Sequence, residues 1–327
     1  MKWIVSLCLL GALVGSCDLE EEDEETSEET DAVSYTPVER LPVDEELNLF
    51  VFGNSLVVHE VTPTPTEEKK VPHWLGLLAA EGSKGLTVDG RYGFLRQFSD
   101  FSELTPQWGF QSVESLWTDE TDSFSSIAFD TAILTPTNFI QYQAPDVDYY
   151  DEAGVTPLST SLSTLDQTVS AISGIGIYIY EGWPDMNGFG DFPSGVDLDA
   201  YYAYAAGDYH NWFITYHDTI LEQRPGLNIR MIPVNHIMTI LLTETVLSGM
   251  TITDLYEDDA PHGQPTYYFL ASLIVYMSLY EEKVPLTFSI PTTVHELVRN
   301  NYEDTVDRIW DELQDFNFAD GASRVFF

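Results

Sequence analysis

The chain has 327 residues, of which 44% are hydrophobic and 13% aromatic, and this is enough for one folded domain with a substantial core. Its 54 acidic residues against 13 basic ones give a formal net charge of −41. That balance excludes nucleic acid as an expected partner, because contacts with a phosphate backbone need a basic surface. The two cysteines, Cys8 and Cys17, lie near the N-terminus, so the rest of the chain has no thiol for catalysis or for a metal site.

The first 46 residues divide into two segments that precede the folded part. Lys2 and the apolar run of residues 4–14 are typical of a signal peptide, and the run is too short to span a bilayer. Residues 13–17 read Leu-Val-Gly-Ser-Cys, which resembles a bacterial lipobox, so we predict a signal peptide over residues 1–16 and a lipid on Cys17. The alternative is an ordinary secretory signal with an incidental cysteine.

Residues 17–46 are acidic at first and then contain proline, so we expect a disordered tether. The expected location is the bacterial cell envelope, at the outer membrane or the cell surface. The lipid on Cys17 would be the only attachment to a membrane.

Residues 47–327 alternate short apolar strands with helices and show no break that indicates a second domain. Strands are predicted at residues 47–52, 86–88, 131–134, 175–180 and 228–232, and helices at residues 73–81, 198–224, 237–247 and 267–280. Strands separated by helices predict an α/β domain with a central parallel sheet of about five strands covered on both faces, followed by a C-terminal helical extension.

Two short motifs supply residues for acyl transfer. The first strand ends in Gly53-Asn54-Ser55-Leu56, and Asp259-Ala260-Pro261-His262 follows about two hundred residues later, before an apolar helix. Ser55 is a candidate nucleophile, His262 its base and Asp259 the carboxylate that orients the base. Alone, a Gly-x-Ser sequence usually only forms a turn, and an Asp-x-x-His sequence is usually a helix cap or a solvated loop.

The two motifs together resemble the first and last sequence blocks of the SGNH hydrolases, also called GDSL-type esterases. Gly93 matches the glycine of the second block, with Gly90 as the weaker choice, and Asn138 matches the asparagine of the third. The resemblance implies a flavodoxin-like three-layer sandwich, with the active site at the carboxyl ends of the strands. It also implies an oxyanion hole formed by the backbone N–H groups of Ser55 and Gly93 and the side-chain amide of Asn138.

The sequence departs from this family in two places. Asn54 replaces the usual aspartate, which is not the nucleophile, and the third block keeps only its asparagine, Asn138. The nucleophile is also not in the Gly-x-Ser-x-Gly elbow of α/β-hydrolases, because Val57 occupies the last position.

The resemblance implies an ester hydrolase or acyltransferase without a cofactor, and the sequence leaves that choice open. The aromatic-rich segments 94–125 and 182–209 favour a carbohydrate esterase that removes acetyl groups from a polysaccharide, with Trp183 and Asn54 as candidate substrate-binding residues. The alternative for Trp183 is that it anchors its loop to the core. The alternative functions are a lipid or short-chain acyl esterase, with an acylated small molecule as substrate, or a non-catalytic glycan-binding surface lipoprotein.

The seven histidines show no spacing typical of metal ligands, so no metal is expected. His59 follows Ser55 by four residues. On a helix it would share a face with Ser55 and border the site, whereas a capping or packing role is the alternative.

Overall fold

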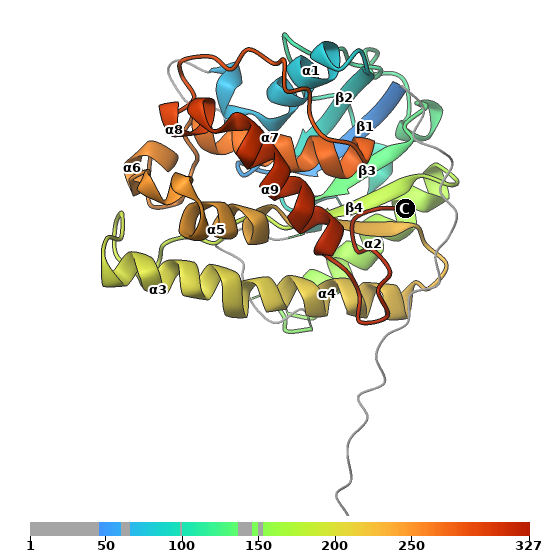
Figure 1. Cartoon of the computed structure of the whole chain (residues 1–327). Coiled ribbons are helices and arrows are strands. Elements are labelled where there is room, and N and C mark those ends of the chain that lie inside the picture. Colours follow the sequence, from blue (N-terminus) through green and yellow to red (C-terminus); the bar gives the residue numbers. More distant parts are fainter. Residues whose placement is uncertain (1–45, 60–65, 99, 137–145, 150–152) are drawn as a thin grey trace, which may run out of the picture. The chain divides into compact units, whose positions relative to one another are not determined.

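The fold is known from a computed structural model, which describes residues 46–59, 66–98, 100–136, 146–149 and 153–327. Five strands form one parallel sheet in the order β2-β1-β3-β4-β5 (Figure 1). They are β1 (Glu46–Gly53), β2 (Gly85–Tyr92), β3 (Thr131–Leu134), β4 (Gly176–Tyr180) and β5 (Ile229–Ile232). This is the strand order of flavodoxin-like folds, and it confirms the predicted α/β class and the five predicted strands.

Helices cover both faces of the sheet. They are α1 (Val71–Glu81), α2 (Pro157–Ala171), α3 (Val196–Tyr204), α4 (His210–Gln223), α5 (Val234–Glu244), α6 (Ile252–Leu255), α7 (Pro265–Tyr280), α8 (Glu296–Asn300) and α9 (Tyr302–Asp315). Helix α7 packs against α1, α5 and α9, whereas α2 packs against α4 (Figure 1). The predicted helix over 198–224 is interrupted by a π-helical turn at Ala205–Tyr209, where Gly207 leaves helical geometry.

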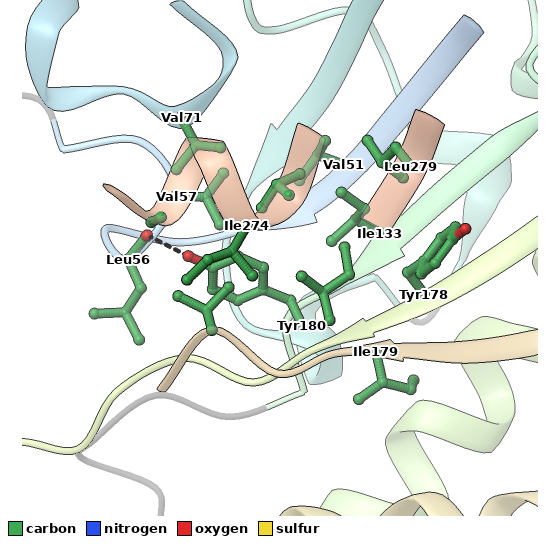
Figure 2. Packing of buried hydrophobic residues seen from close by; sticks show 14 of the residues in the cluster. Val51, Leu56, Val57, Val71, Ile133, Tyr178, Ile179, Tyr180, Ile274 and Leu279 are labelled. Carbon is green, nitrogen blue, oxygen red and sulfur yellow. Dashed lines mark hydrogen bonds between the residues drawn. The ribbon is translucent and has the colours of Figure 1, made fainter. Parts of the chain in front are cut away.

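Helix α7 is apolar on all sides because other elements surround it. Residues 266–280 are all buried, and Pro265 starts the helix at a position where its missing N–H costs nothing. Figure 2 shows Ile274 and Leu279 of this helix beside Val51 and Ile133, which are paired across β1 and β3. This packing fixes α7, and with it the segment that enters α7, relative to the sheet.

The other side of β1 carries aromatic side chains. Phe50 and Phe52 alternate with Val51, so they point to the opposite face, and their ring centroids lie 4.7 Å apart. Phe101 and Phe124, from the long segment between β2 and β3, pack against Phe52 with centroids 5.3 and 6.2 Å away. Aromatic residues of this segment therefore build the core beneath β1.

The chain ends along the open edge of β5. Met231 donates its N–H to the carbonyl of Arg324 at 2.8 Å, and the Arg230 guanidinium donates to the carbonyl of Phe326 at 2.6 Å. The C-terminal segment therefore covers backbone groups that an edge strand would otherwise expose. The described residues belong to one compact unit, Val33–Phe327, and the other unit, Met1–Ala32, falls outside them.

Within the part of the chain that the structure describes, no helix has the length and apolarity needed to cross a membrane. The predicted signal peptide, the lipidated Cys17 and nearly all of the predicted tether precede residue 46 and lie outside the described residues.

Candidate active site

Ser55 lies in a tight turn directly after β1. The Asn54 side-chain oxygen accepts a hydrogen bond from the N–H of Leu56 at 2.9 Å, and the Asn54 carbonyl accepts from Val57 at 3.0 Å and Val58 at 2.9 Å. Asparagine favours such turns because its short side chain bonds to the backbone two residues on. The turn places Ser55, 8% exposed, at the carboxyl end of β1, as the sequence predicts.

Two tyrosines fix the backbone of this turn. The Tyr268 hydroxyl donates to the Ser55 carbonyl at 2.6 Å. The Tyr180 hydroxyl donates to the Leu56 carbonyl at 3.4 Å, and Figure 2 shows this second bond. Tyr268 is in the first turn of α7 and Tyr180 is the last residue of β4. The turn that contains Ser55 is therefore held by two rigid elements, α7 and β4.

His262 lies on a short closed loop that leads into α7. Tyr256 and Gly263 pair across the base of the loop, and Glu257 donates its N–H to the His262 carbonyl at 2.8 Å. The indole N–H of Trp183 donates to the carbonyl of Pro261, inside the loop, at 2.9 Å. These contacts fix the position of His262 on the loop.

The carboxylate that contacts His262 is Asp258, and the predicted Asp259 is therefore wrong as its partner. His262 Nδ1 lies 2.7 Å from Asp258 Oδ2, and Asp258 Oδ1 accepts from the N–H groups of His262 at 2.9 Å and Ala260 at 3.1 Å. Because an ionised carboxylate only accepts, His262 Nδ1 carries the proton in this contact. Asp259 is exposed, and its backbone carbonyl is the acceptor for the N–H of Met186 at 3.4 Å.

These contacts favour the ionised form of the Asp258 carboxyl group. Burial alone would raise the pKa of the Asp258 carboxyl, but the hydrogen bonds from the side chain and backbone of His262 outweigh burial and lower it. Asp258 is thus ionised near neutral pH and holds the imidazole of His262 in one tautomer.

A second histidine lies against His262. The ring of His59 stacks on that of His262, with centroids 4.0 Å apart and planes 9° from parallel. His59 Nε2 bonds to Glu257, whose other carboxylate oxygen accepts from the Lys69 ammonium group. The stacking brings the segment that contains Ser55 against the loop that contains His262. His59 therefore borders the site, although it follows a turn and not a helix.

Of the three predicted oxyanion donors, the structure excludes one. The N–H of Gly93 donates to the Gly53 carbonyl at 2.9 Å, so it joins the ends of β1 and β2 and the prediction for Gly93 is wrong. The weaker choice, Gly90, pairs with Val51 inside the sheet. The Ser55 N–H makes no hydrogen bond to the described part of the chain. Asn138 lies outside the described residues.

The two predicted substrate-binding residues are buried, and that prediction is wrong for both. Trp183 is 0% exposed and packs on Tyr267 with ring centroids 4.4 Å apart, so it anchors its loop. Asn54 is 1% exposed, and its side-chain nitrogen is buried without a partner in the structure. Trp108 is half-buried instead, and its ring lies where a Cβ on Gly53 or Gly90 would be.

Acidic side chains lie beside the His262 loop. Asp185 follows Trp183 by two residues, and its pKa is raised by burial and by the nearby charge of Asp259. Among the residues that the structure describes, no three His, Cys, Asp or Glu side chains are arranged to hold a metal ion.

No family model matches this sequence, and a search of curated proteins finds no match either. The fold is similar to that of a crystal structure of a DUF4886 family protein from Bacteroides uniformis, with a TM-score of 0.55 and 10% sequence identity. The match covers 86% of this chain and 98% of that one. At this identity the likeness concerns the fold alone, and it agrees with the three-layer α/β architecture.

Proposed function

We propose that this protein is a serine ester hydrolase that uses Ser55, His262 and Asp258. The observation that carries the proposal is the 2.7 Å contact between Asp258 and His262 Nδ1, on a loop packed against the turn that presents a serine. A serine hydroxyl becomes an effective nucleophile when a base takes its proton, and a carboxylate on the far nitrogen keeps that base in the right tautomer. The 2.7 Å contact supports the second of these two roles for Asp258 and His262.

The proposed reaction has two halves. The Ser55 oxygen bonds to the ester carbonyl carbon while His262 takes the hydroxyl proton. His262 then gives this proton to the departing alcohol as the ester C–O bond breaks. Water then attacks the acyl-serine while His262 takes a proton from it. His262 returns this proton to the Ser55 oxygen as the acyl–serine C–O bond breaks, which releases the acid.

The negative oxygen of each tetrahedral intermediate needs donors at its position. Within the described part of the chain the Ser55 N–H makes no hydrogen bond, and it lies on the attacking residue itself, so it is the first donor in this proposal. The Asn138 amide stays a proposed second donor from the sequence resemblance. Loss of one such donor typically costs about 10²–10³ in rate.

For the substrate, we propose an acetylated polysaccharide. Half-buried Trp108 beside Gly53 offers an aromatic surface near the nucleophile turn. Asp185 and Asp259 beside the His262 loop offer carboxylates that accept hydrogen bonds from sugar hydroxyls. A lipid or short-chain acyl ester is the second candidate, and a glycan-binding protein without activity is the third. The lipid on Cys17 and a place in the cell envelope also remain proposals from the sequence.

Reaction with a fluorophosphonate probe tests the enzyme class without a known substrate. We expect covalent labelling at Ser55, located by peptide mass mapping, and loss of labelling in Ser55→Ala. The matched control is Ser248→Ala, which removes an exposed serine from another loop and should be labelled like the wild type. Hydrolysis of p-nitrophenyl acetate should fall about 10³-fold or more in Ser55→Ala. A folded protein that is not labelled at Ser55 would contradict the proposal and favour the glycan-binding alternative.

The same preparation distinguishes the substrate classes. We expect higher kcat/KM for acetylated oligosaccharides than for p-nitrophenyl octanoate, since binding of the sugar away from the ester orients it against Ser55. A steady rise of kcat/KM with acyl-chain length would instead support a lipid esterase.

A further inference from the structure

A polar cavity of about 420 Å³ lies between α6, the start of α7 and residues 292–299, which lead into α8. Nine of the eleven residues that line it are polar, and the exceptions are Pro265 and Val294. Its volume is within the range of about 300–1,000 Å³ that is usual for small-molecule sites, but most such sites are lined mainly by apolar groups. A ligand that fits this cavity therefore needs hydrogen-bonding groups on most of its surface.

Hydrogen bonds fix the walls of the cavity relative to one another. The N–H of Gln264, directly before α7, donates to the carbonyl of Leu255, the last residue of α6, at 2.7 Å. The N–H of His295, directly before α8, donates to the Thr266 hydroxyl at 2.9 Å. The three segments are thus joined within the chain itself, so a ligand does not have to order them.

Arg299 contributes donors to this cavity that the rest of the described chain leaves free. Its Nε donates to the Val294 carbonyl at 3.0 Å, and its two terminal nitrogens make no hydrogen bond or ion pair with the described residues. The next basic residues on either side in the sequence, Lys283 and Arg308, both pair with carboxylates. In a chain with 54 acidic and 13 basic residues, Arg299 is thus an exception that leaves its fork of donors open to a ligand.

Other side chains that line the cavity also have hydrogen-bonding atoms without a partner in the described ranges. The Gln264 amide and the exposed Thr292 hydroxyl bond to none of these residues. His295 Nδ1 accepts from the N–H of Leu297 at 3.2 Å, so the ring proton is on Nε2, which has no partner there either. The cavity therefore offers both donors and acceptors.

The charges of the lining favour a neutral ligand. Asp254 and Glu296 supply two carboxylates, so the cavity does not attract an anion, whereas the guanidinium of Arg299 disfavours a cation. Asp254 Oδ2 accepts from the Thr251 N–H at 2.8 Å and from its hydroxyl at 2.6 Å, which leaves Oδ1 as an acceptor. A sugar hydroxyl donates one hydrogen bond and accepts two, so a ring that carries several hydroxyls matches such a mixture.

We propose that this cavity is a subsite for one neutral sugar unit of a polysaccharide. The hydroxyls of the sugar accept from Arg299 and donate to Asp254 and Glu296. The Gln264 amide does both, and because Gln264 follows His262 by two residues, the bound unit lies beside the end of the loop that carries the proposed base. This inference rests on the proposed function for its effect on catalysis, whereas the binding of the sugar does not.

Isothermal titration calorimetry of the full chain with neutral hexasaccharides tests binding directly. The probes are maltohexaose, xylohexaose, mannohexaose and laminarihexaose, with hexagalacturonate as the anionic comparison. We expect at least one neutral hexasaccharide to bind. Arg299→Ala should weaken its affinity about 10- to 100-fold and Gln264→Ala about 3- to 10-fold, since the first removes a charged donor and the second a neutral one.

The matched controls remove the same kinds of side chain elsewhere. Lys283→Ala removes a basic residue that pairs with Asp307 outside the cavity, and Gln314→Ala removes an exposed glutamine of α9. Both should bind like the wild type. Circular dichroism and thermal melting establish that each variant is folded. If Arg299→Ala does not fold, Gln264→Ala decides the question, because the Gln264 side chain makes no bond within the described residues.

Three results would overturn the inference. Unchanged affinity in Arg299→Ala and Gln264→Ala would mean that the sugar binds elsewhere. Absence of binding by all four neutral hexasaccharides would remove the proposed ligand. Tighter binding of hexagalacturonate than of any neutral hexasaccharide would show that the cavity takes an anion instead.

Fluorophosphonate labelling and kinetics separate this inference from the proposed function. In both cavity variants, labelling of Ser55 and hydrolysis of p-nitrophenyl acetate should stay within about twofold of the wild type, because this ester has no sugar to place in the cavity. The kcat/KM for the acetylated form of the bound hexasaccharide should fall by about the same factor as the affinity. If the cavity binds a sugar but Ser55 is never labelled, the proposed function fails and the subsite stands. If Ser55 is labelled but no hexasaccharide binds, the subsite fails and the proposed function stands.

Discussion

The choice between Asp258 and Asp259 is tested by two substitutions at adjacent positions. In Asp258→Asn the amide oxygen still accepts from the N–H groups of His262 and Ala260, which Asp258 Oδ1 now does at 2.9 and 3.1 Å. The amide nitrogen then replaces Oδ2 and donates to His262 Nδ1. That moves the imidazole proton to Nε2, the nitrogen that must take the proton of Ser55. The substitution therefore preserves the loop and produces the wrong tautomer.

The loss should be about 10³- to 10⁴-fold in kcat, or about 4–5.5 kcal/mol of activation free energy. The unfolding temperature should barely change, because the Asp258 side chain is 40% exposed and the backbone bonds of the loop persist. Asp259→Asn is the matched control: it removes an exposed charge one residue away and should change kcat less than about threefold.

The assay is kcat and KM for p-nitrophenyl acetate with both variants at pH 7.5, next to thermal melting. Equal losses in the two variants, or the larger loss in Asp259→Asn, would refute the pairing of Asp258 with His262. A large fall in melting temperature for Asp258→Asn would mean that the carboxylate stabilises the loop and does not act by fixing the tautomer of His262.

Two further predictions concern stability and location. His217 is fully buried beside Arg324, and its pKa is lowered by burial and by that guanidinium to about 3. Below about pH 6.5, His217 is therefore protonated in the unfolded chain and stays neutral in the folded chain. Lowering the pH from 7 to 5 should thus reduce the free energy of unfolding by about 2 kcal/mol through this residue. Urea unfolding of the wild type and His217→Gln at both pH values measures it, and an equal loss in the two proteins would contradict the assignment. Separately, Cys17→Ser should move the mature protein from the membrane to the soluble fraction, and equal partitioning of both forms would leave an ordinary secretory signal.

The sheet was predictable because its strands are buried on both faces. Residues such as 47–52 and 131–134 form short continuous apolar runs between turn signals, which is typical of parallel strands. Helix α2 was not predicted, since its Ser- and Thr-rich sequence has a weak apolar face. The signal for it is local: the Thr156 side chain caps the helix and Pro157 occupies its first position.

The site was predictable in part. Ser55 and His262 were chosen as candidates because the carboxyl end of a strand and the segment before an apolar helix each present one reactive side chain. The orienting carboxylate was not found, because Glu257, Asp258 and Asp259 are consecutive and spacing alone cannot choose among them. In the structure Asp258 contacts His262 Nδ1, on the loop that the pairing of Tyr256 with Gly263 closes.

The solvent exposure of the aromatic residues could not be predicted from the sequence either. A tryptophan in a long loop has the same neighbours in sequence whether it faces solvent or anchors the loop. Trp183 anchors, since its indole N–H bonds to Pro261 and its ring packs on Tyr267. It therefore acts on the site indirectly, through the loop that carries His262.

The stacked histidine pair depends on tertiary structure in the same way. The four-residue spacing from Ser55 to His59 has meaning on a helix, but the chain turns there, and His59 reaches His262 because Tyr268 of α7 holds the Ser55 turn at 2.6 Å. Both parts of the proposed catalytic machinery are thus attached to β1 and α7, in which most residues are buried. Variation in substrate would then arise in the long segments after β2 and β4, which carry Trp108 and Asp185, while the reacting groups remain fixed.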